Sequence, residues 1–156
     1  PLLYEFPMGA VLSQIKQGKN PNALYWMAAL MADLAPPLPA TEAFKLIPIP
    51  MHPIDRLLRG FNQTEILCRQ ISFKTGLPLD LGLLHKCKQT KHQAELKRSE
   101  RLTNLQHSFN LSRPPPEQVI LIDDVMTTGA TAICTAKALK EAGCKKVYFW
   151  ACCRTP

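Results

Sequence analysis

Residues 119–131 read Val-Ile-Leu-Ile-Asp-Asp-Val-Met-Thr-Thr-Gly-Ala-Thr, and they carry the strongest fold signal in the sequence. Its first four residues are apolar, rich in β-branched side chains and without alternation, which is typical of a central parallel strand covered on both faces. Asp123 and Asp124 follow where that strand is expected to leave the sheet. The stretch therefore predicts an α/β fold with paired carboxylates at the carboxyl end of a strand, where open α/β sheets bind ligands.

Small and hydroxyl-bearing residues come soon after the two acids: Thr127, Thr128, Gly129, Ala130 and Thr131. They lead into a helical pattern, so their N–H groups and hydroxyls are expected to converge on an anion at a positive helix end. Gly129 allows the backbone to approach that anion closely. An ordinary strand-turn-helix junction is the alternative, because helices often begin with Thr. The fusion of both halves at this spacing favours a site for a phosphorylated ribose.

This stretch resembles the signature of type I phosphoribosyltransferases and matches it throughout. The resemblance implies a type I phosphoribosyltransferase-like α/β fold, with a central, mostly parallel sheet flanked by helices. It also implies that Asp123 and Asp124 hold the ribose hydroxyls of 5-phosphoribosyl diphosphate, directly or through Mg²⁺, as the catalytic and metal-binding residues. Residues 127–131 would then wrap the 5-phosphate.

The length of 156 residues suits one domain, with a helical part over residues 1–40 and an α/β core over residues 41–156. The composition, 46% hydrophobic and 20% charged, is typical of a soluble globular protein. No apolar run approaches the roughly 20 residues that cross a bilayer, and no export signal is visible, so we expect a cytoplasmic protein. Pro1 stands where an initiator Met is expected, which is consistent with a missing upstream piece.

Six cysteines lack a Cys-x-x-Cys pair or a small-domain framework, so we interpret them as reduced thiols. His85, Cys87 and His92 fit no standard zinc spacing. Six of the basic residues and two of the acidic residues lie between Lys86 and Arg101, so this stretch carries +4 of the net charge of +7. It is interpreted as a solvated surface, a loop that closes over pyrophosphate, or a patch for the nucleic-acid backbone.

Apolar spacing and breakers predict the elements along the rest of the chain. We expect two helices between Gly9 and Ala35, the second capped by Asn20 with Pro21 at its first position, and then a proline-rich connector. A strand over 44–47, a loop over 48–52 and a helix from Gln63 to Gly76 follow. The remaining predictions are strands over 79–84, 109–111 and 147–152, a short helix over 99–106, and a helix from Thr131 to Gly143.

Further segments resemble the ComF family of competence-associated, phosphoribosyltransferase-like proteins. They are Ile47-Pro48-Ile49-Pro50, Arg59-Gly60-Phe61-Asn62-Gln63, Gln93 with Arg101 and Asn104 before Phe109, Ile15-Lys16-x-Gly18, and Cys153-Arg154. The similarity covers nearly the whole chain. Two features depart from what is expected: the sequence has no counterpart to the cysteine-rich, zinc-binding N-terminal segment usual in the family, and Thr127 replaces the Asp that assists the purine in hypoxanthine-type enzymes.

The resemblance implies that the loop after the first core strand presents backbone groups to pyrophosphate, which gives Pro48, Ile49, Pro50, Met51 and His52 as candidates. Two cations, Arg59 and Lys91, are candidates to stabilise the leaving group. Both have plainer alternatives, since Arg59 could pair with a helix-end carbonyl or a surface acid, and His52 could be a turn residue. No residue stands out as a general base.

Two functions remain open, together with a less favoured structural adaptor. The first is a Mg²⁺-dependent phosphoribosyltransferase with an unidentified acceptor, linked to competence, DNA uptake or DNA utilisation. The second is a non-catalytic accessory of DNA uptake that uses the phosphoribosyl site for binding or sensing and contacts single-stranded DNA and competence-machinery proteins. Few aromatic residues accompany the cations, which weakens the case for a stacking platform. Whether the protein is an enzyme is left open.

Overall fold

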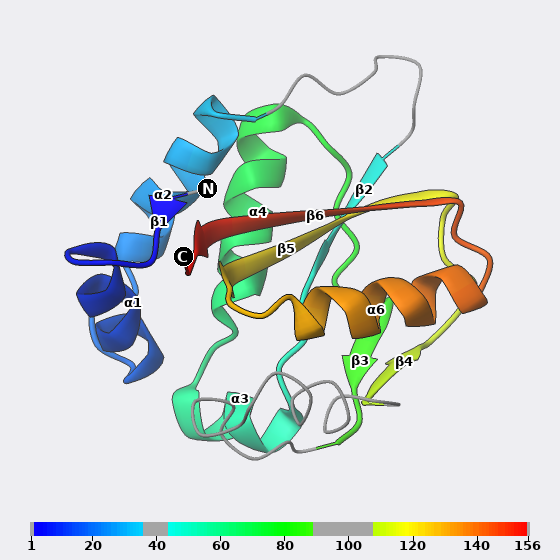
Figure 1. The fold of residues 1–156 in the computed structure, drawn as a ribbon, viewed down its shortest axis with the longest axis horizontal. Coiled ribbons are helices and arrows are strands. Elements are labelled where there is room, and N and C mark those ends of the chain that lie inside the picture. Colours follow the sequence, from blue (N-terminus) through cyan, green and yellow to red (C-terminus); the bar gives the residue numbers. More distant parts are fainter. Residues whose placement is uncertain (1, 36–43, 89–107, 156) are drawn as a thin grey trace.

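The computed structural model describes residues 2–35, 44–88 and 108–155, and its centre is a parallel sheet. The strand order is β1-β6-β5-β2, and every neighbouring pair is parallel. The strands are β1 (Leu2–Leu3), β2 (Phe44–Pro48), β5 (Gln118–Met126) and β6 (Lys146–Arg154). A separate antiparallel pair consists of β3 (Leu84–Lys86) and β4 (Phe109–Leu111). The predicted α/β fold with a central parallel sheet is therefore confirmed (Figure 1).

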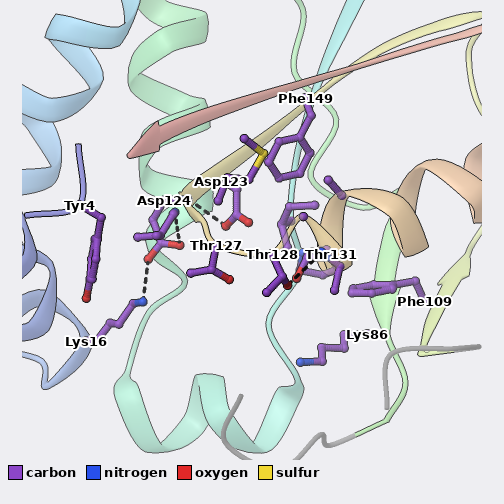
Figure 2. Close-up of a pocket in the computed structure, with 17 residues that line it drawn as sticks. Tyr4, Lys16, Lys86, Phe109, Asp123, Asp124, Thr127, Thr128, Thr131 and Phe149 are labelled. Carbon is purple, nitrogen blue, oxygen red and sulfur yellow. Dashed lines mark hydrogen bonds and ion pairs between the residues drawn. The ribbon is translucent and has the colours of Figure 1, made fainter. Parts of the chain in front are cut away.

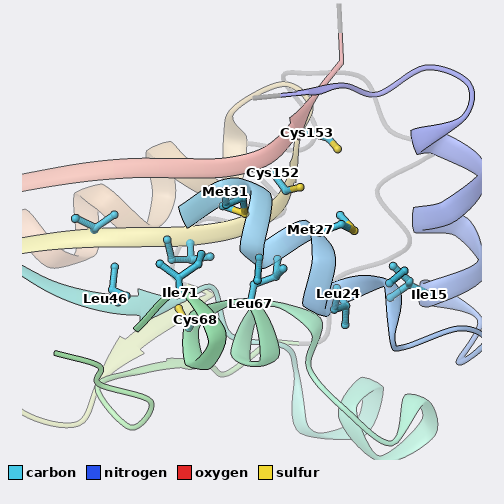
Figure 3. Packing of buried hydrophobic residues seen from close by; sticks show 14 of the residues in the cluster. Ile15, Leu24, Met27, Met31, Leu46, Leu67, Cys68, Ile71, Cys152 and Cys153 are labelled. Atoms are coloured by element: carbon cyan, nitrogen blue, oxygen red, sulfur yellow. The ribbon is translucent and has the colours of Figure 1, made fainter. Parts of the chain in front are cut away.

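Helices cover both faces of this sheet (Figure 1). The helices that do so are α1 (Met8–Lys16), α2 (Ala23–Asp33), α4 (Gln63–Thr75) and α6 (Ala130–Glu141), whereas α3 (Pro53–Arg59) buries no residue. One apolar cluster joins α1, α2 and α4 to the sheet, and a second joins α6 and the β3–β4 pair to the opposite face. Figure 3 shows the first cluster, in which Leu24 and Met27 of α2 lie near Leu67 of α4. Burial on both faces explains why the strand at 119–122 lacks a polar side.

Strand alternation divides β5 between the two clusters. Ile120 and Ile122 belong to the α4 side, whereas Val119 and Leu121 belong to the α6 side. Successive side chains of a strand point to opposite faces, so the same alternation separates the two acids that follow. Asp123 continues the α6 side, and Asp124 continues the α4 side.

Most predicted elements are present, and the ends of α4 show why. Asn62 caps that helix by accepting a hydrogen bond from the Thr64 N–H through its side chain (3.3 Å), and the helix begins at Gln63 as predicted. It ends at Gly76, whose φ of +73° is the left-handed conformation that glycine adopts readily. The helices near the N-terminus and the strands at 44–48, 109–111 and 146–154 also confirm the predictions.

Several details of the sequence prediction are wrong. Residues 79–84 do not form one strand: Leu79 makes an isolated bridge to Leu46, and β3 begins only at Leu84. Helix α2 begins at Ala23 rather than at Pro21, and Asn20 instead has a positive φ of +51°. Helix α3 was not predicted. The short helix expected over 99–106, the prolines at 36, 37 and 39, and most of the basic stretch lie outside the described residues.

Two further findings concern the thiols and the helices. All six cysteines are free, and four of them are buried. In the part of the chain that the structure describes, no helix is both long enough and apolar enough to span a bilayer.

Candidate functional site

The two acids lie where β5 extends beyond the end of its neighbour β2. Pairing between β2 and β5 ends at Pro48 and Ile122, whereas pairing between β5 and β6 continues to Met126. Asp123 and Asp124 are therefore in the strand rather than beyond it, which corrects the expectation that they leave the sheet. Past the end of β2 they line a pocket of about 370 Å³. The position is the carboxyl edge at which parallel sheets bind ligands.

Each carboxylate has its own set of partners. Asp123 accepts a hydrogen bond through Oδ1 from the Asp124 N–H (2.9 Å). Asp124 accepts through Oδ1 from the Val125 N–H (2.9 Å) and through Oδ2 from Gln63 Nε2 (3.2 Å). Its Oδ2 also lies 3.7 Å from Nζ of Lys16 (Figure 2). Asp124 is thus held by two segments that are far from it in sequence.

These surroundings move the pKa values of the two acids in opposite directions. Burial raises the pKa of Asp123 well above its ordinary value, and the neighbouring Asp124 carboxylate raises it further. Burial also acts to raise the pKa of Asp124, but the Lys16 charge and the hydrogen bonds from Asp123, Gln63 and Val125 outweigh it and lower that pKa. Asp124 is therefore the more acidic member of the pair.

The turn after β5 lies along the same pocket. Residues 127–132 line it, and α6 begins at Ala130 with Gly129 as its N-terminal cap. The Ala130 N–H donates to Oγ1 of Thr128 (3.4 Å). Gly129 has a φ of +75°, and an added Cβ would meet nothing within 4 Å, so the backbone conformation rather than crowding requires glycine. The first turn of α6 thus borders the pocket, and a helix start is a place where an anion is favoured.

The loop after β2 contributes two of its five candidate residues to the pocket. Ile49 and Pro50 line it, whereas Pro48, Met51 and His52 do not. The Ile49 carbonyl accepts from Oγ1 of Thr64 (2.6 Å) and Nδ2 of Asn62 (3.2 Å), and its N–H donates to the Ile122 carbonyl (2.9 Å). The start of α4 therefore fixes the path of this loop.

His52 and Arg59 have local partners. His52 caps α3 by accepting from the Ile54 N–H through Nδ1 (3.3 Å), which matches the plainer interpretation of a turn residue. Arg59 donates from Nη1 to Oε1 of Gln63 (2.9 Å) and does not line the pocket. Since Gln63 in turn donates to Asp124, Arg59 reaches the acids through one intervening side chain. Lys91 lies outside the described residues.

Sequence reasoning missed several residues that line the pocket: Tyr4, Lys16, Lys86, Phe109 and Phe149. They come from five different segments, and Figure 2 shows Tyr4 and Lys16 on the opposite side of the acids from Phe109 and Lys86. Burial lowers the pKa of Lys86, while Asp55 and Asp123 oppose that shift. Three of them had a sequence signal: Lys86 begins the basic stretch, one interpretation of which was a loop over pyrophosphate, and Lys16 and Phe109 belong to segments that resemble the ComF family.

The donor set fits Mg²⁺ bound together with a phosphorylated ligand. Mg²⁺ prefers one or two carboxylates plus phosphate oxygens and waters over a closed protein cage. Among the described residues no group of three or more His, Cys, Asp or Glu side chains could hold a metal ion, whereas Asp123 and Asp124 lie beside the turn that would take a phosphate. The two acids are thus suited to share a metal with its ligand.

Comparisons with solved structures concern the fold. The chain resembles a structure described as the allosteric regulatory enzyme of purine biosynthesis, with a TM-score of 0.54 and 19% identity over 85% of this chain and 26% of that chain. A hypoxanthine phosphoribosyltransferase from Trypanosoma cruzi has a TM-score of 0.45 at 10% identity, over 92% of this chain and 78% of that one. The first of these likenesses concerns the fold alone, which is α/β with a central parallel sheet.

Comparisons with curated proteins concern the family, although no family model matches the sequence. DNA utilization protein YhgH of Salmonella typhi is 28% identical over 97% of this chain and 69% of its own length. Competence protein F of Haemophilus influenzae is 31% identical over 70% of this chain, and Competence protein ComFC of Streptococcus pneumoniae is 36% identical over 68%. The latter two matches span 49% and 46% of those relatives, about half their length. Together with the Arg-Gly-Phe-Asn-Gln segment and the signature strand, these relatives show that the chain belongs to the ComF family.

Proposed function

We propose that this chain binds 5-phosphoribosyl diphosphate together with Mg²⁺ in the pocket at the carboxyl end of β5. One observation carries the proposal: the acid pair and the turn at 127–131 line a single pocket of about 370 Å³. The pair offers carboxylate oxygens and the turn offers N–H groups at a helix start. A ligand that carries vicinal hydroxyls at one end and a phosphate at the other satisfies both.

Different residues bind different parts of the ligand. The turn at 127–131 binds the 5-phosphate through its N–H groups and hydroxyls. Asp123 and Asp124 accept hydrogen bonds from the ribose hydroxyls or share Mg²⁺ with the diphosphate. Ile49 and Pro50 border the same pocket and shape it on the side of the diphosphate, without a backbone donor of their own, because the Ile49 N–H donates to Ile122 and proline has none. Arg59 acts through Gln63 rather than by direct contact, and Lys91 and the remaining loop residues stay candidates for the diphosphate.

Transfer of the phosphoribosyl group is the reaction that this arrangement suits. The bond between ribose C1 and the diphosphate oxygen breaks and its electron pair leaves with the diphosphate, while an acceptor nucleophile forms a new bond to C1. Positive charge develops on the sugar, as in glycoside transfer, and the buried carboxylates stabilise it. Bound Mg²⁺ would supply charge neutralisation for the leaving group. The acceptor and its base are unassigned.

Calorimetry tests the binding step. The protein is titrated with 5-phosphoribosyl diphosphate in the presence of Mg²⁺ and, as a control, with EDTA, while ribose 5-phosphate and pyrophosphate are titrated separately. We expect Mg²⁺-dependent binding of the diphosphate sugar, with weaker binding of each fragment. An absence of heat with the intact ligand and Mg²⁺ contradicts the proposal. Pyrophosphate release with mixed acceptors separates an enzyme from a binding protein.

An accessory role in DNA handling is the second candidate. The observation in its favour is that the relatives are named for competence and DNA utilisation, and the chain carries a net charge of +7. A protein that contacts the phosphates of the nucleic-acid backbone binds single-stranded oligonucleotides with an affinity that falls steeply as the salt concentration rises. Fluorescence anisotropy at several salt concentrations measures this slope. Binding of the diphosphate sugar without turnover, combined with salt-sensitive DNA binding, favours this role over catalysis.

A further inference from the structure

Lys16 reaches the acid pair from a part of the chain that precedes the sheet core. It is the last residue of α1, where a cation is favoured by the helix dipole. Its Nζ lies 3.7 Å from Oδ2 of Asp124, and both side chains line the pocket (Figure 2). The Lys16 side chain is 40% exposed, whereas that of Asp124 is 10% exposed. One partner is therefore fixed in the protein and the other is free to move into the pocket.

Asp124 is anchored without Lys16. Its Oδ1 accepts from the Val125 N–H at 2.9 Å, and its Oδ2 accepts from the buried Gln63 at 3.2 Å. These bonds hold the carboxylate in place when its charged partner leaves. The four-carbon stem of Lys16 carries a compact charge that can take several positions.

A divalent cation at Asp124 would compete with the Lys16 ammonium for the same oxygen. Two cations a few ångströms apart in a partly buried site repel each other strongly, because the effective dielectric constant there is well below that of water. The ammonium and the divalent cation are thus alternatives at Oδ2 of Asp124. A diphosphate that arrives with the divalent cation supplies new negative charge within the pocket.

We propose that Lys16 is an exchangeable counter-ion. In the ligand-free protein it neutralises Asp124, and when a divalent cation and a diphosphate sugar bind, the ammonium leaves Asp124 and pairs with an anionic oxygen of the ligand. This inference rests on the proposed function. Lys16 then opposes binding of the cation alone and favours binding of the cation with its anionic ligand. It is a positioning residue that makes the two bind cooperatively, and such coupling is reciprocal.

Binding of Mn²⁺, which takes the same oxygen ligands as Mg²⁺, tests the exchange. Free Mn²⁺ is followed by electron paramagnetic resonance, with and without 5-phosphoribosyl diphosphate, for the wild type and for Lys16→Met, Lys16→Gln and Lys16→Arg. We expect Lys16→Met to bind Mn²⁺ alone about threefold more tightly, since removal of a partly exposed ion pair changes affinity by a small factor. The diphosphate sugar should bind the Mn²⁺-loaded variant about tenfold more weakly, because a charge-assisted contact is lost.

The other variants serve as controls. Lys16→Arg keeps the charge and should behave as the wild type does, and Lys16→Gln should resemble Lys16→Met. Lys19, an exposed cation three residues further on that does not line the pocket, gives the matched control Lys19→Met, which should change neither affinity. Thermal unfolding shows whether each variant is folded, and Lys16→Gln carries the test if Lys16→Met is not.

The outcomes separate the inference from the function on which it rests. If the wild type binds no diphosphate sugar with either Mn²⁺ or Mg²⁺, the proposed function fails. If the wild type binds it and the two neutral variants match the wild type in both titrations, the exchange fails and the proposed function stands. Weaker binding of Mn²⁺ alone to the neutral variants also overturns the exchange, because Lys16 would then only orient Asp124.

Discussion

The pocket has two sides that are built in different ways. The side of Asp123 is built mainly from one contiguous piece of chain, in which strand, turn and helix follow one another from 118 to 141, with Lys86 of β3 and Phe109 of β4 beside it. The side of Asp124 is assembled from separate segments, with Lys16 from α1 and Gln63 from α4. Strand alternation directs the two adjacent acids toward these two sides. Neighbours in sequence thus acquire opposite pKa shifts because their spatial neighbours differ.

Removal of both acids should have the largest effect. We expect Asp123→Asn combined with Asp124→Asn to lower the affinity for 5-phosphoribosyl diphosphate with Mg²⁺ by more than about 100-fold, since each charged hydrogen-bonding group contributes roughly 1.5–3 kcal/mol. Calorimetry measures the loss, and Asp33→Asn, which changes an exposed acid outside the pocket, is the control. Unchanged affinity in the double variant would show that the ligand binds elsewhere.

A change in the turn tests the contiguous side alone. Gly129→Ala places a Cβ at a φ of +75°, which costs on the order of 1–2 kcal/mol of strain. We expect the turn to shift and the affinity for the diphosphate sugar to fall about tenfold, as the 5-phosphate loses its N–H donors. Gly76→Ala is the matched control, because Gly76 has a similar φ of +73° but ends α4 away from the pocket. Equal losses of affinity in both variants would mean that general destabilisation, not the phosphate contact, is responsible.

A change at Gln63 tests the assembled side. Gln63→Met keeps the length of the side chain but removes the donor to Asp124 and the acceptor for Arg59. We expect about fivefold weaker binding of the diphosphate sugar, corresponding to about 1 kcal/mol for one lost hydrogen bond. Arg59→Met should have a smaller effect in the same direction, because Arg59 acts through Gln63. The control is Arg69→Met, which removes a cation from the exposed face of the same helix.

The same contrast explains what sequence analysis could predict. The contiguous side could be predicted because the hydrophobic run, the two acids, the glycine and the hydroxyls all lie within 13 residues. Local geometry therefore nearly fixes their arrangement. The parallel sheet and the start of α4 followed from equally local signals. The strand predicted over 79–84 was wrong because an apolar residue there, Leu83, is buried in the second apolar cluster without belonging to a strand.

The assembled side could not be predicted, because it depends on packing between distant elements. Arg59 was a candidate to contact the diphosphate, and its hydrogen bond to Gln63 is local, four residues along the chain. The contact that could not be predicted is the one from Gln63 to Asp124, which forms only because α4 packs beside β5. Lys16 belongs to a helix whose apolar residues Leu12 and Ile15 pack into the core, and that packing is what directs the end of the helix toward Asp124. Neither contact has a sequence period or spacing of its own.

The smallest effect, on stability, distinguishes the two acids most directly. An unfolded carboxyl titrates near pH ~3.9. Asp123 has a raised pKa in the fold, so the wild type loses stability as the pH rises through that folded-state value. Asp123→Asn removes this loss and should be more stable than the ligand-free wild type at pH 7. The difference should vanish below pH ~4, where the carboxyl is protonated in both states.

Asp124 should show the opposite sign. Its pKa is lowered in the fold, so the stability that it contributes is present above pH ~3.9 and is lost as the pH falls through the folded-state value. Asp124→Asn should therefore be less stable than the wild type at pH 7, because Lys16 and Gln63 lose a charged partner. Urea unfolding in EDTA at pH 4 and pH 7 measures both variants. If both substitutions change stability in the same direction at pH 7, the two sides of the pocket do not differ electrostatically, and the distinction between them is wrong.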